Sequence, residues 1–359
     1  MSLSLVATIF KADLTIVGSY PALVYSLMFD AISNETSTVI IKSVKGVSEG
    51  YYIALRENNS DSIIYYGQIT TIDTDSNSGV MTLSANFMWN VLNGEMIVTN
   101  KTGSSYENHL KSLINKYSSS TSGIFQNITT LTNTPYEVTS SNGAVNKNFI
   151  DYIIRGFKLH NITISTNKIG QGTSNGIPYY YPKVEIGAVS DTMNFSDNIL
   201  SFTNWKVTDS RLLRGYANEL WLVDKASTDM ENPNVIAKYW LQNDGVVVNQ
   251  INSNVNQPTQ VSIYLYDKTV TDNPDNDSIG RENLGGNSYS HHISFSVNLN
   301  NNFIELKDLK LGLQSNIFYQ DKVYKSILTG YELSSDTDDI RLIFGNLRFG
   351  KKDLIESDV

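Results

Sequence analysis

Apolar and polar residues alternate along much of the chain, and this pattern predicts β-strands. The clearest case is a hairpin over 62–85, SIIYYGQITTIDTDSNSGVMTLSA, in which two β-rich runs are joined by turn-forming Asp, Ser, Asn and Gly. HISFSVNL (292–299) alternates strictly and places its apolar residues on one strand face. Further strands are predicted at 3–10, 37–47, 50–57, 162–166, 179–187, 217–225, 260–268 and 235–250, the last interrupted by an Asp-Gly turn at 244–245.

Three stretches have helical spacing instead. SANFMWNVLNGE (84–95) predicts a short helix that begins at Ser84 and ends at Gly94. SSYENHLKSLINKYSS (104–119) begins with Ser104 followed by Glu107, the pattern of a capping box, and its apolar residues share one face. NKNFIDYIIRGF (146–157) predicts another helix, whereas the polar stretch 271–287 shows no periodicity and predicts a loop.

Composition limits the classes of function. The 359 residues are 40% hydrophobic and 18% charged, and the net charge of −9 comes without a basic run, which argues against a dedicated nucleic-acid binder. The absence of cysteine excludes disulfides, thiolate catalysis and Cys-ligated zinc. We expect no signal peptide and no membrane span, because the N-terminus lacks a basic region and no apolar run is long enough.

The few histidines do not predict a catalytic or metal site. They are His109, His160, His291 and His292, and adjacent strand residues such as the last two point to opposite faces. We therefore interpret His291 and His292 as ordinary residues at the start of a strand. Hydrolase, zinc-protease and nucleotide-binding motifs are absent from the sequence.

Two acidic stretches resemble ion-binding loops only faintly. DTDSNSG (73–79) alternates Asp73, Asp75 and Asn77, but its Gly is one place late for an EF-hand and Ser84 stands where a bidentate Glu is needed. A hairpin turn is the favoured interpretation. DNPDND (272–277) could also gather oxygen ligands, although a solvated loop explains it better.

Aromatic and acidic residues leave two further functions open. The tyrosines at 179–181, with Tyr264 and Tyr266, could stack on sugars, but alternation places the last two on one strand face, where packing explains them equally well. Carboxylate pairs for glycoside or peptide hydrolysis could be formed by residues far apart, and no pair stands out among the 36 acidic residues.

The C-terminal stretch YKSILTGYELSSDTDDIRLIFGNLRFGK predicts a hairpin turned at SSDTDD (334–339), followed by a short basic tail. We predict that Ile340, Leu342 and Phe344 face a core, and that Arg341 and Ile343 face outward or toward a subunit boundary. Nothing in the hairpin carries chemistry, so its expected role is to shape the fold.

The order of these strands resembles the structural part of siphophage tail-tip Tal proteins, relatives of the baseplate hub protein of contractile-tailed phages. The resemblance rests on hydrophobic pattern, order and length in 64–95, 199–225, 239–248 and the C-terminal 303–351. It implies a mainly β fold with α/β inserts (α+β), with two hub β-barrel-like domains and two accessory domains. The expected boundaries are 1–102 for the first barrel, 103–182 for an α/β insert, 183–208 and 285–359 for the second barrel, and 209–284 for an accessory β-rich domain.

The resemblance also implies a function. Three copies are expected to form a pseudo-sixfold ring at the virion tail tip, which closes or extends the tail tube and lets DNA pass. The implied partners are a distal tail protein hexamer, the tape measure protein and receptor-binding or baseplate proteins, with assembly in the host cytoplasm. The lytic extension of many Tal proteins is not in this sequence, so we expect no enzyme activity and assign no catalytic, cofactor or metal residues. A receptor- or carbohydrate-binding phage protein and a cell-wall hydrolase remain the alternatives.

Overall fold

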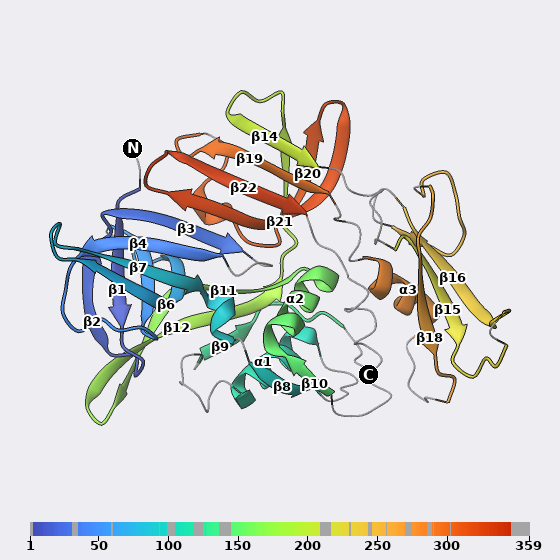
Figure 1. Ribbon diagram of the computed structural model, residues 1–359, viewed down its shortest axis with the longest axis horizontal. Helices are drawn as coiled ribbons and strands as arrows, with labels where there is room; N and C mark the ends of the chain where they lie inside the picture. Colours follow the sequence, from blue (N-terminus) through green and yellow to red (C-terminus); the bar gives the residue numbers. More distant parts are fainter. Residues whose placement is uncertain are drawn as a thin grey trace.

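The protein is mainly β, with few helices. Figure 1 shows the computed structural model, in which the strands form several sheets. The structure describes residues 3–30, 35–58, 60–92, 94–98, 105–117, 125, 127–135, 145–208, 217–229, 231–242, 246–255, 257–269, 275–285, 289, 291–301 and 303–345. The predicted basic tail after the C-terminal hairpin lies outside these ranges.

A first β unit is formed by the N-terminal strands. They are β1 (Leu5–Phe10), β2 (Ile16–Pro21), β3 (Val24–Asp30), β4 (Thr36–Lys42), β5 (Tyr52–Glu57), β6 (Ile63–Asp75) and β7 (Val80–Phe87). They pair antiparallel in the order β3-β4-β7-β6-β5-β1-β2. Alternation directs one face of each strand into a core, as in β4, where Ser37, Val39 and Ile41 are buried and their neighbours are not.

A second β unit is formed near the C-terminus. Its strands are β13 (Thr192–Ser196), β14 (Phe202–Thr208), β19 (His292–Asn298), β20 (Gln314–Tyr319), β21 (Lys322–Ser334) and β22 (Asp339–Gly345). They follow the order β14-β19-β22-β21-β20-β13, antiparallel except for the last pair, which is parallel. The core of both units is continuous and includes the buried residues of β19 and β22.

The two units have the same strand order. Every pairing among five strands of the first unit recurs among five strands of the second. The matched strands are β3 with β14, β4 with β19, β5 with β20, β6 with β21 and β7 with β22. The sixth strand, β13, corresponds to β2, because omission of β1 would place β2 parallel beside β5, as β13 lies parallel beside β20. The chain therefore contains one β unit twice.

Backbone details repeat as well as the order. In β6 a bulge at Thr70 turns its hydroxyl to donate to Ser84 O at 3.2 Å, and in β21 a bulge at Thr329 donates to Ile343 O at the same distance. The two bulge threonines are 259 residues apart in the sequence, and so are the two residues that accept their hydrogen bonds, Ser84 and Ile343. Gly50 and Gly312 are also equivalent: each has a positive φ, 81° and 86°, and donates its N–H to the residue before the bulge.

An α/β insert follows the first unit. It contains the short 3₁₀ helix η1 (Met88–Leu92), β8 (Glu95–Val98), α1 (Tyr106–Tyr117), β9 (Asn127–Thr130), β10 (Val145–Asn148), α2 (Phe149–His160), β11 (Ile162–Ser174) and β12 (Ile177–Ala188). β8 pairs with β10, while β11, β12 and β9 form a separate sheet. Figure 1 shows the long β11–β12 hairpin passing beneath the first unit, and Trp89 Nε1 donates to Ile164 O at 2.7 Å.

The predicted helices of this insert are confirmed with changes at their starts. The Ser105 hydroxyl caps α1 by accepting from Asn108 N, and the predicted cap residue Ser104 lies outside the described residues. Glu107 is buried and accepts hydrogen bonds from Thr132 and Thr134. Over 84–95 the helix prediction is wrong: β7 continues to Phe87 because Met81, Leu83 and Ala85 keep strand alternation, and only η1 follows.

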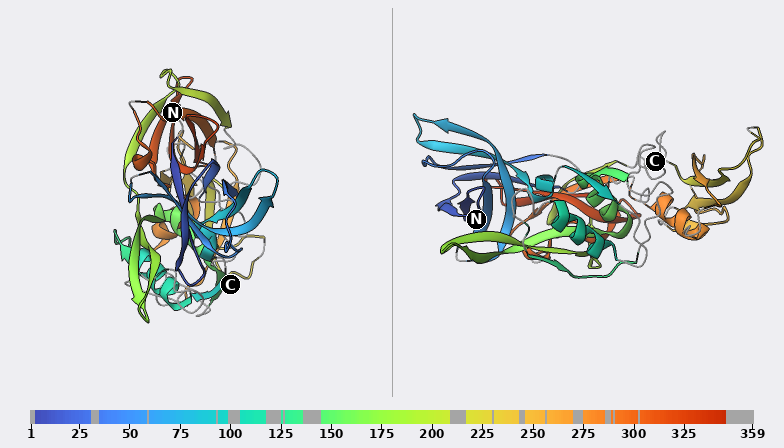
Figure 2. Two further views of the ribbon diagram at one scale, coloured as in Figure 1. Left: turned by 90° about the vertical axis from the view of Figure 1, so that its left-hand side faces the viewer. Right: turned by 90° about the horizontal axis from the view of Figure 1, so that it is seen from below.

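A smaller sheet is inserted between β14 and β19. Its strands β15 (Glu219–Asp224), β16 (Val235–Leu241), β17 (Val247–Val248) and β18 (Val261–Tyr266) follow the order β17-β16-β15-β18, with a core of its own beneath α3 (Asn276–Gly285). Figure 2 shows this sheet set apart from the β units. The loop predicted over 271–287 is therefore wrong for 276–285, where Asp275 caps a helix that buries Ile279 and Leu284.

A remaining structural element is the 3₁₀ turn η3 (Leu306–Asp308), which precedes β20. Among the described residues, no helix is both long and apolar enough to cross a membrane.

Candidate functional site: the junction of the two β units

The two β units are joined by one strand pair, β3 with β21. The C-terminal half of β21 lies antiparallel to β3, with Gly330 opposite Asp30 and Ser334 opposite Ser26. Beyond the strand, Ser335 donates its N–H to Tyr25 O at 2.9 Å and accepts from Tyr25 N at 3.0 Å. Backbone hydrogen bonds thus make one sheet of both units.

Aromatic packing reinforces the junction. The rings of Phe29 and Tyr331 stack at 4.2 Å between centroids, and Tyr65 meets Phe29 edge to face at 5.6 Å. Burial raises the pKa of Tyr331, so its hydroxyl stays neutral at any physiological pH. The junction is therefore packed like a protein interior.

The C-terminal hairpin has the faces that the alternation predicts. Ile340, Leu342 and Phe344 are buried in the core, which confirms their assignment. Arg341 is exposed and lies 3.8 Å from Glu332 across the strand pair, and Ile343 is half-buried. This hairpin therefore contributes packing to the second unit and the pairing edge of the junction.

The histidines pack in two regions, the start of β19 and an aromatic cluster of the α/β insert. His291 is buried with Nε2 at 2.8 Å from Ser326 Oγ, while His292 begins β19 on the other face, as predicted for neighbours in a strand. His109 Nδ1 lies 2.9 Å from the Tyr152 hydroxyl, and the Tyr106 ring contacts the rings of both Tyr152 and His160. Burial, aided by Arg155, lowers the pKa of His160 to about 4, so this histidine is neutral at pH 7.

The calcium-like stretch 73–79 forms the turn between β6 and β7, as its favoured interpretation predicts. Asp75 Oδ1 accepts from Asn77 N at 2.8 Å and Oδ2 accepts from Ser78 Oγ at 2.6 Å. These hydrogen bonds lower the pKa of Asp75. In the described part of 272–277, Asp275 accepts from Ser278 in the same way at the start of α3. Both acidic stretches use their carboxylates in local structure.

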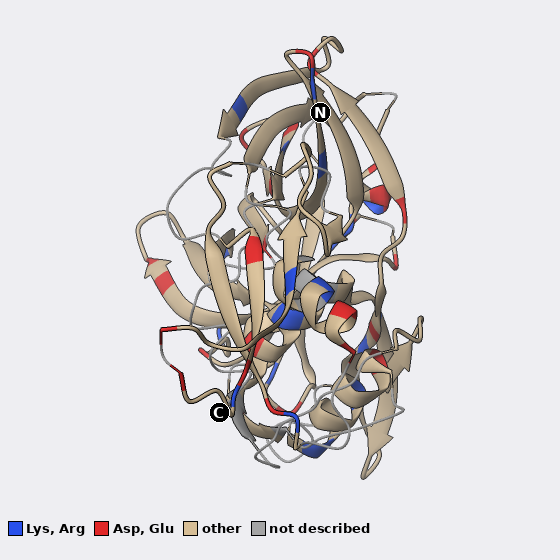
Figure 3. Cartoon of the chain, turned by 90° about the vertical axis from the view of Figure 1, so that its right-hand side faces the viewer, with Lys and Arg blue, Asp and Glu red and all other residues tan. Residues whose placement is uncertain are grey.

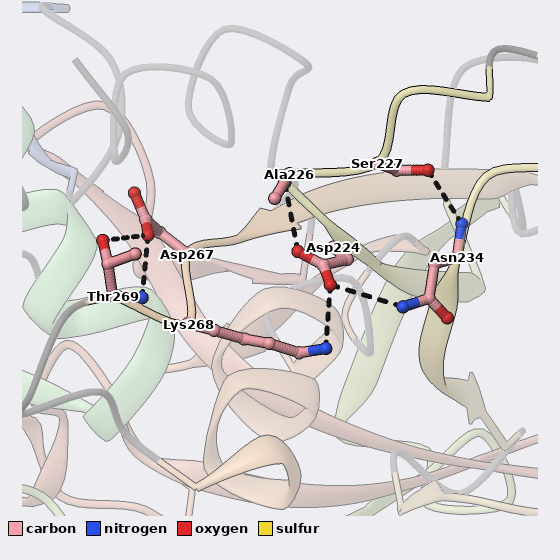
Figure 4. A network of polar contacts seen from close by, with 7 residues as sticks. All are labelled: Asp224, Ala226, Ser227, Asn234, Asp267, Lys268 and Thr269. Carbon is pink, nitrogen blue, oxygen red and sulfur yellow. Dashed lines mark hydrogen bonds and ion pairs between the residues drawn. The ribbon is translucent and has the colours of Figure 1, made fainter.

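Acidic residues come together at one end of the small sheet (Figure 4). Asp224 accepts from Lys268 Nζ at 2.8 Å, from Ala226 N at 3.0 Å and from Asn234 Nδ2 at 3.3 Å. Nearby Asp267 accepts from Thr269 and lies 3.3 Å from Lys225. The hydrogen bond from Lys268 lowers the pKa of Asp224, which favours an ionised, turn-stabilising carboxylate over a general acid.

The tyrosines considered for sugar stacking are engaged in packing. Tyr179 and Tyr181 cover Gly172 and Gly170 on the facing strand of the β11–β12 hairpin, where an added Cβ would meet their rings. Tyr180 turns to the other side and donates its N–H to Leu14 O. Its ring centroid lies 6.4 Å from that of Phe10. On β18, Tyr264 and Tyr266 pack against the core of the small sheet.

The sequence did not reveal the apolar outer face of β18. Val261, Ile263 and Leu265 are exposed there and alternate with Ser262, Tyr264 and Tyr266, which are partly buried. The strict alternation of 261–266 was the available signal, but it does not show which face is inward. Within the described part of the chain, no three His, Asp or Glu side chains are grouped closely enough to hold a metal ion.

The sequence matches no protein-family model and no curated protein. The fold, however, is similar to those of solved tail proteins. A 43 kDa tail protein of prophage MuSo2 from Shewanella oneidensis aligns with a TM-score of 0.56 and 6% identity over 98% of this chain and 99% of that one. A tail protein from Neisseria meningitidis aligns at 0.51 and 9% identity, over 98% and 99% of the two chains. Prophage tail protein gp18 from Listeria monocytogenes aligns at 0.50 and 8%, over 99% and 98%.

At identities this low, the TM-scores show a shared fold alone, and the coverage extends it over nearly the whole length of both chains in each comparison. The resemblance to phage tail proteins inferred from strand order is thus confirmed at the level of the fold.

Proposed function

We propose that this chain is a structural phage or prophage tail protein, a tail-tip or baseplate hub that trimerises to close or extend the tail tube and lets DNA pass. The observation that carries the proposal is the duplicated β unit. A chain with two equivalent units offers two comparable surfaces, so three chains offer six, and a hexameric tube can continue onto a threefold ring.

Two further observations support this role. The fold is that of proteins named as tail proteins, including two from prophages. Charged residues make up 18% of the chain, are distributed over many elements of the cartoon in Figure 3, and give a net charge of −9. A lumen built from such a chain attracts DNA weakly, because non-specific binding depends on clustered Lys and Arg.

The partners in this proposal follow from position. The ring would contact a distal tail protein hexamer on the tube side, the tape measure protein at its axis and receptor-binding or baseplate proteins outside, at the virion tail tip. The α/β insert and the small sheet lie off the ring in this arrangement, on the side away from the tube.

The test is the shape of the purified full-length chain. Electron microscopy of negatively stained protein should show a pierced ring, and light scattering should give the mass of three chains. A compact monomer at high concentration, with a lysis band at about 40 kDa on a zymogram of Gram-positive cell walls, would instead identify a cell-wall hydrolase. A monomer that binds glycans in an array would favour the carbohydrate-binding alternative.

A further inference from the structure

The duplicated unit leaves one strand edge open where its counterpart is paired. In the second unit, β21 extends past β20, and its residues 330–334 pair with β3. In the first unit, β6 extends past β5 in the same way, and its residues 71–75 pair with β7 on one side. Among the described residues, no strand pairs with the other side of this segment. Thr71, Asp73, Thr74 and Asp75 are exposed.

The complementary edge is open in the second unit. β3, which fills the junction, corresponds to β14. Ser26 lies opposite Thr38 of β4, and Lys206 lies opposite Ser294, the counterpart of Thr38 on β19. Residues 206–208 of β14 therefore correspond to 26–28 of β3. Within the described residues β14 pairs with β19 alone, so its outer edge is available.

We propose that β14 of one copy pairs with residues 73–75 of β6 in a second copy, and so repeats the β3–β21 junction between chains. The inference rests on the proposed ring and names the surface that builds it. Transfer of the intrachain register places Lys206 opposite Asp75, Val207 opposite Thr74 and Thr208 opposite Asp73, because Ser26, Leu27 and Met28 lie opposite Ser334, Leu333 and Glu332.

The charges of the two edges agree with this register. Lys206 would face Asp75 directly and Asp73 diagonally, and cross-strand pairs of opposite charge stabilise a sheet. Two β6 edges would instead bring the aspartates together, and like charges opposite one another oppose pairing. The acidic edge therefore discourages β6–β6 association and still accepts β14.

The symmetry of the contact follows from its two different surfaces. A β14–β6 contact is heterologous, so each copy offers one edge of each kind and the contacts close into a ring or continue as a filament. If each junction, within or between chains, turns the next unit by roughly one sixth of a circle, three copies close the ring. Figure 1 shows β14 and the free end of the β6–β7 hairpin on different sides of the molecule, as a ring requires.

The absence of native cysteine permits a direct test. The full-length double variant Thr74→Cys with Val207→Cys places two thiols at directly opposite positions of the proposed strand pair, within the separation a disulfide spans. Mild oxidation followed by non-reducing electrophoresis should give a ladder that ends at three chains. The matched control, Asp73→Cys with Val207→Cys, shifts one thiol to the opposite sheet face and should run as unlinked single chains on the same gel.

The outcomes separate this inference from the proposed function. If the wild-type chain and the reduced variant form a pierced ring but the Thr74–Val207 pair stays unlinked, the β14–β6 contact is wrong and the hub proposal stands. If the pair links and the control does not, but the ladder continues beyond three chains, the contact is right and the threefold ring is wrong. Equal linking of the variant and its control, or a monomer that stays unlinked at high concentration, would also overturn the inference.

Discussion

The two long hairpins of this protein are built alike but differ along one edge. β6–β7 and β21–β22 share a bulge threonine, a four-residue turn and the same pairing register. At the junction, β21 carries Tyr331 and Leu333, which are buried; the equivalent positions of β6 are Ile72, half-buried, and Thr74, exposed. The edge that is covered within the chain buries two large apolar side chains on one face, whereas the open edge has only a half-buried isoleucine and an exposed threonine at the same positions.

This difference shows that one backbone design can serve two purposes. Apolar residues make the intrachain pairing permanent, and exposed acidic residues keep an open edge from pairing without discrimination. Four measurements can break or sharpen the comparison.

The largest effect is expected from Leu342→Asp in β22. Leu342 is fully buried, so the substitution places an unpaired carboxylate in the core and should cost several kcal/mol, enough to give insoluble or unfolded protein. Leu83→Asp, the equivalent change in the first unit, should behave alike, since Leu83 is also fully buried. Arg341→Ser is the exposed control and should fold normally. Tolerance of Leu342→Asp, measured by circular dichroism and soluble yield, would contradict the assigned strand register.

The next effect concerns the junction. Tyr331→Ala removes the ring stacked on Phe29 and should lower the free energy of unfolding by about 3 kcal/mol, in the range for loss of a buried aromatic side chain. Ile72→Ala, at the equivalent but half-buried position of the open edge, should cost about 1 kcal/mol. Urea denaturation of both variants measures the difference. Equal losses would mean that the two edges are equally packed.

Low pH should destabilise the protein through the α/β insert, which has no counterpart in the second unit. The pKa of His160 falls from 6.5 to about 4 on folding, so the unfolded chain binds a proton first as the pH drops. The contribution of neutral His160 to the free energy of unfolding should therefore be fully present above pH 6.5. It should be lost, by about 3 kcal/mol, as the pH falls toward 4. His160→Gln should remove this part of the decline in denaturation curves measured across the window. The control His292→Gln should retain it.

The smallest effect tests the repeat itself. Thr70→Val and Thr329→Val each remove one hydroxyl hydrogen bond of 3.2 Å to a carbonyl at a bulge. Each should lower the free energy of unfolding by about 1 kcal/mol, and the two losses should agree closely. A large loss at one site only would show that the two bulge hydrogen bonds contribute unequally to the free energy of unfolding.

The hydrophobic pattern predicted local elements well and their assembly poorly. Alternation located β19 and β22 because each has one buried face, and the spacing of 106–117 located α1 for the same reason. Helix α3 was missed because only Ile279 and Leu284 mark its inner face. The prediction of a helix at 84–95 failed because strand alternation extends into it.

The junction left no local signal in the sequence. Pairing of Asp30 with Gly330 is a backbone contact between distant segments, and backbone contacts do not constrain which side chains alternate. The repeat was equally hidden. Thr70 and Thr329 stand out only once their hydrogen bonds are known. Equivalent positions on the paired strands, such as Thr82 and Arg341, carry unrelated side chains. Strand order and length, by contrast, were sufficient to suggest the tail-protein fold.

The pairing of β3 with β21 also has a consequence for the time course of synthesis. The strand at 24–30 leaves the ribosome early, but its partner is made 300 residues after Asp30. At translation rates of about 5 to 20 residues per second, the first unit waits roughly 15 to 60 seconds with the β3 edge uncovered. During that wait the β3 side chains lack their partners on β21, such as the Tyr331 ring that stacks on Phe29 in the finished protein. Nascent chains on one messenger are therefore at greatest risk of pairing with each other before β21 emerges, and chaperone demand should be concentrated in that interval.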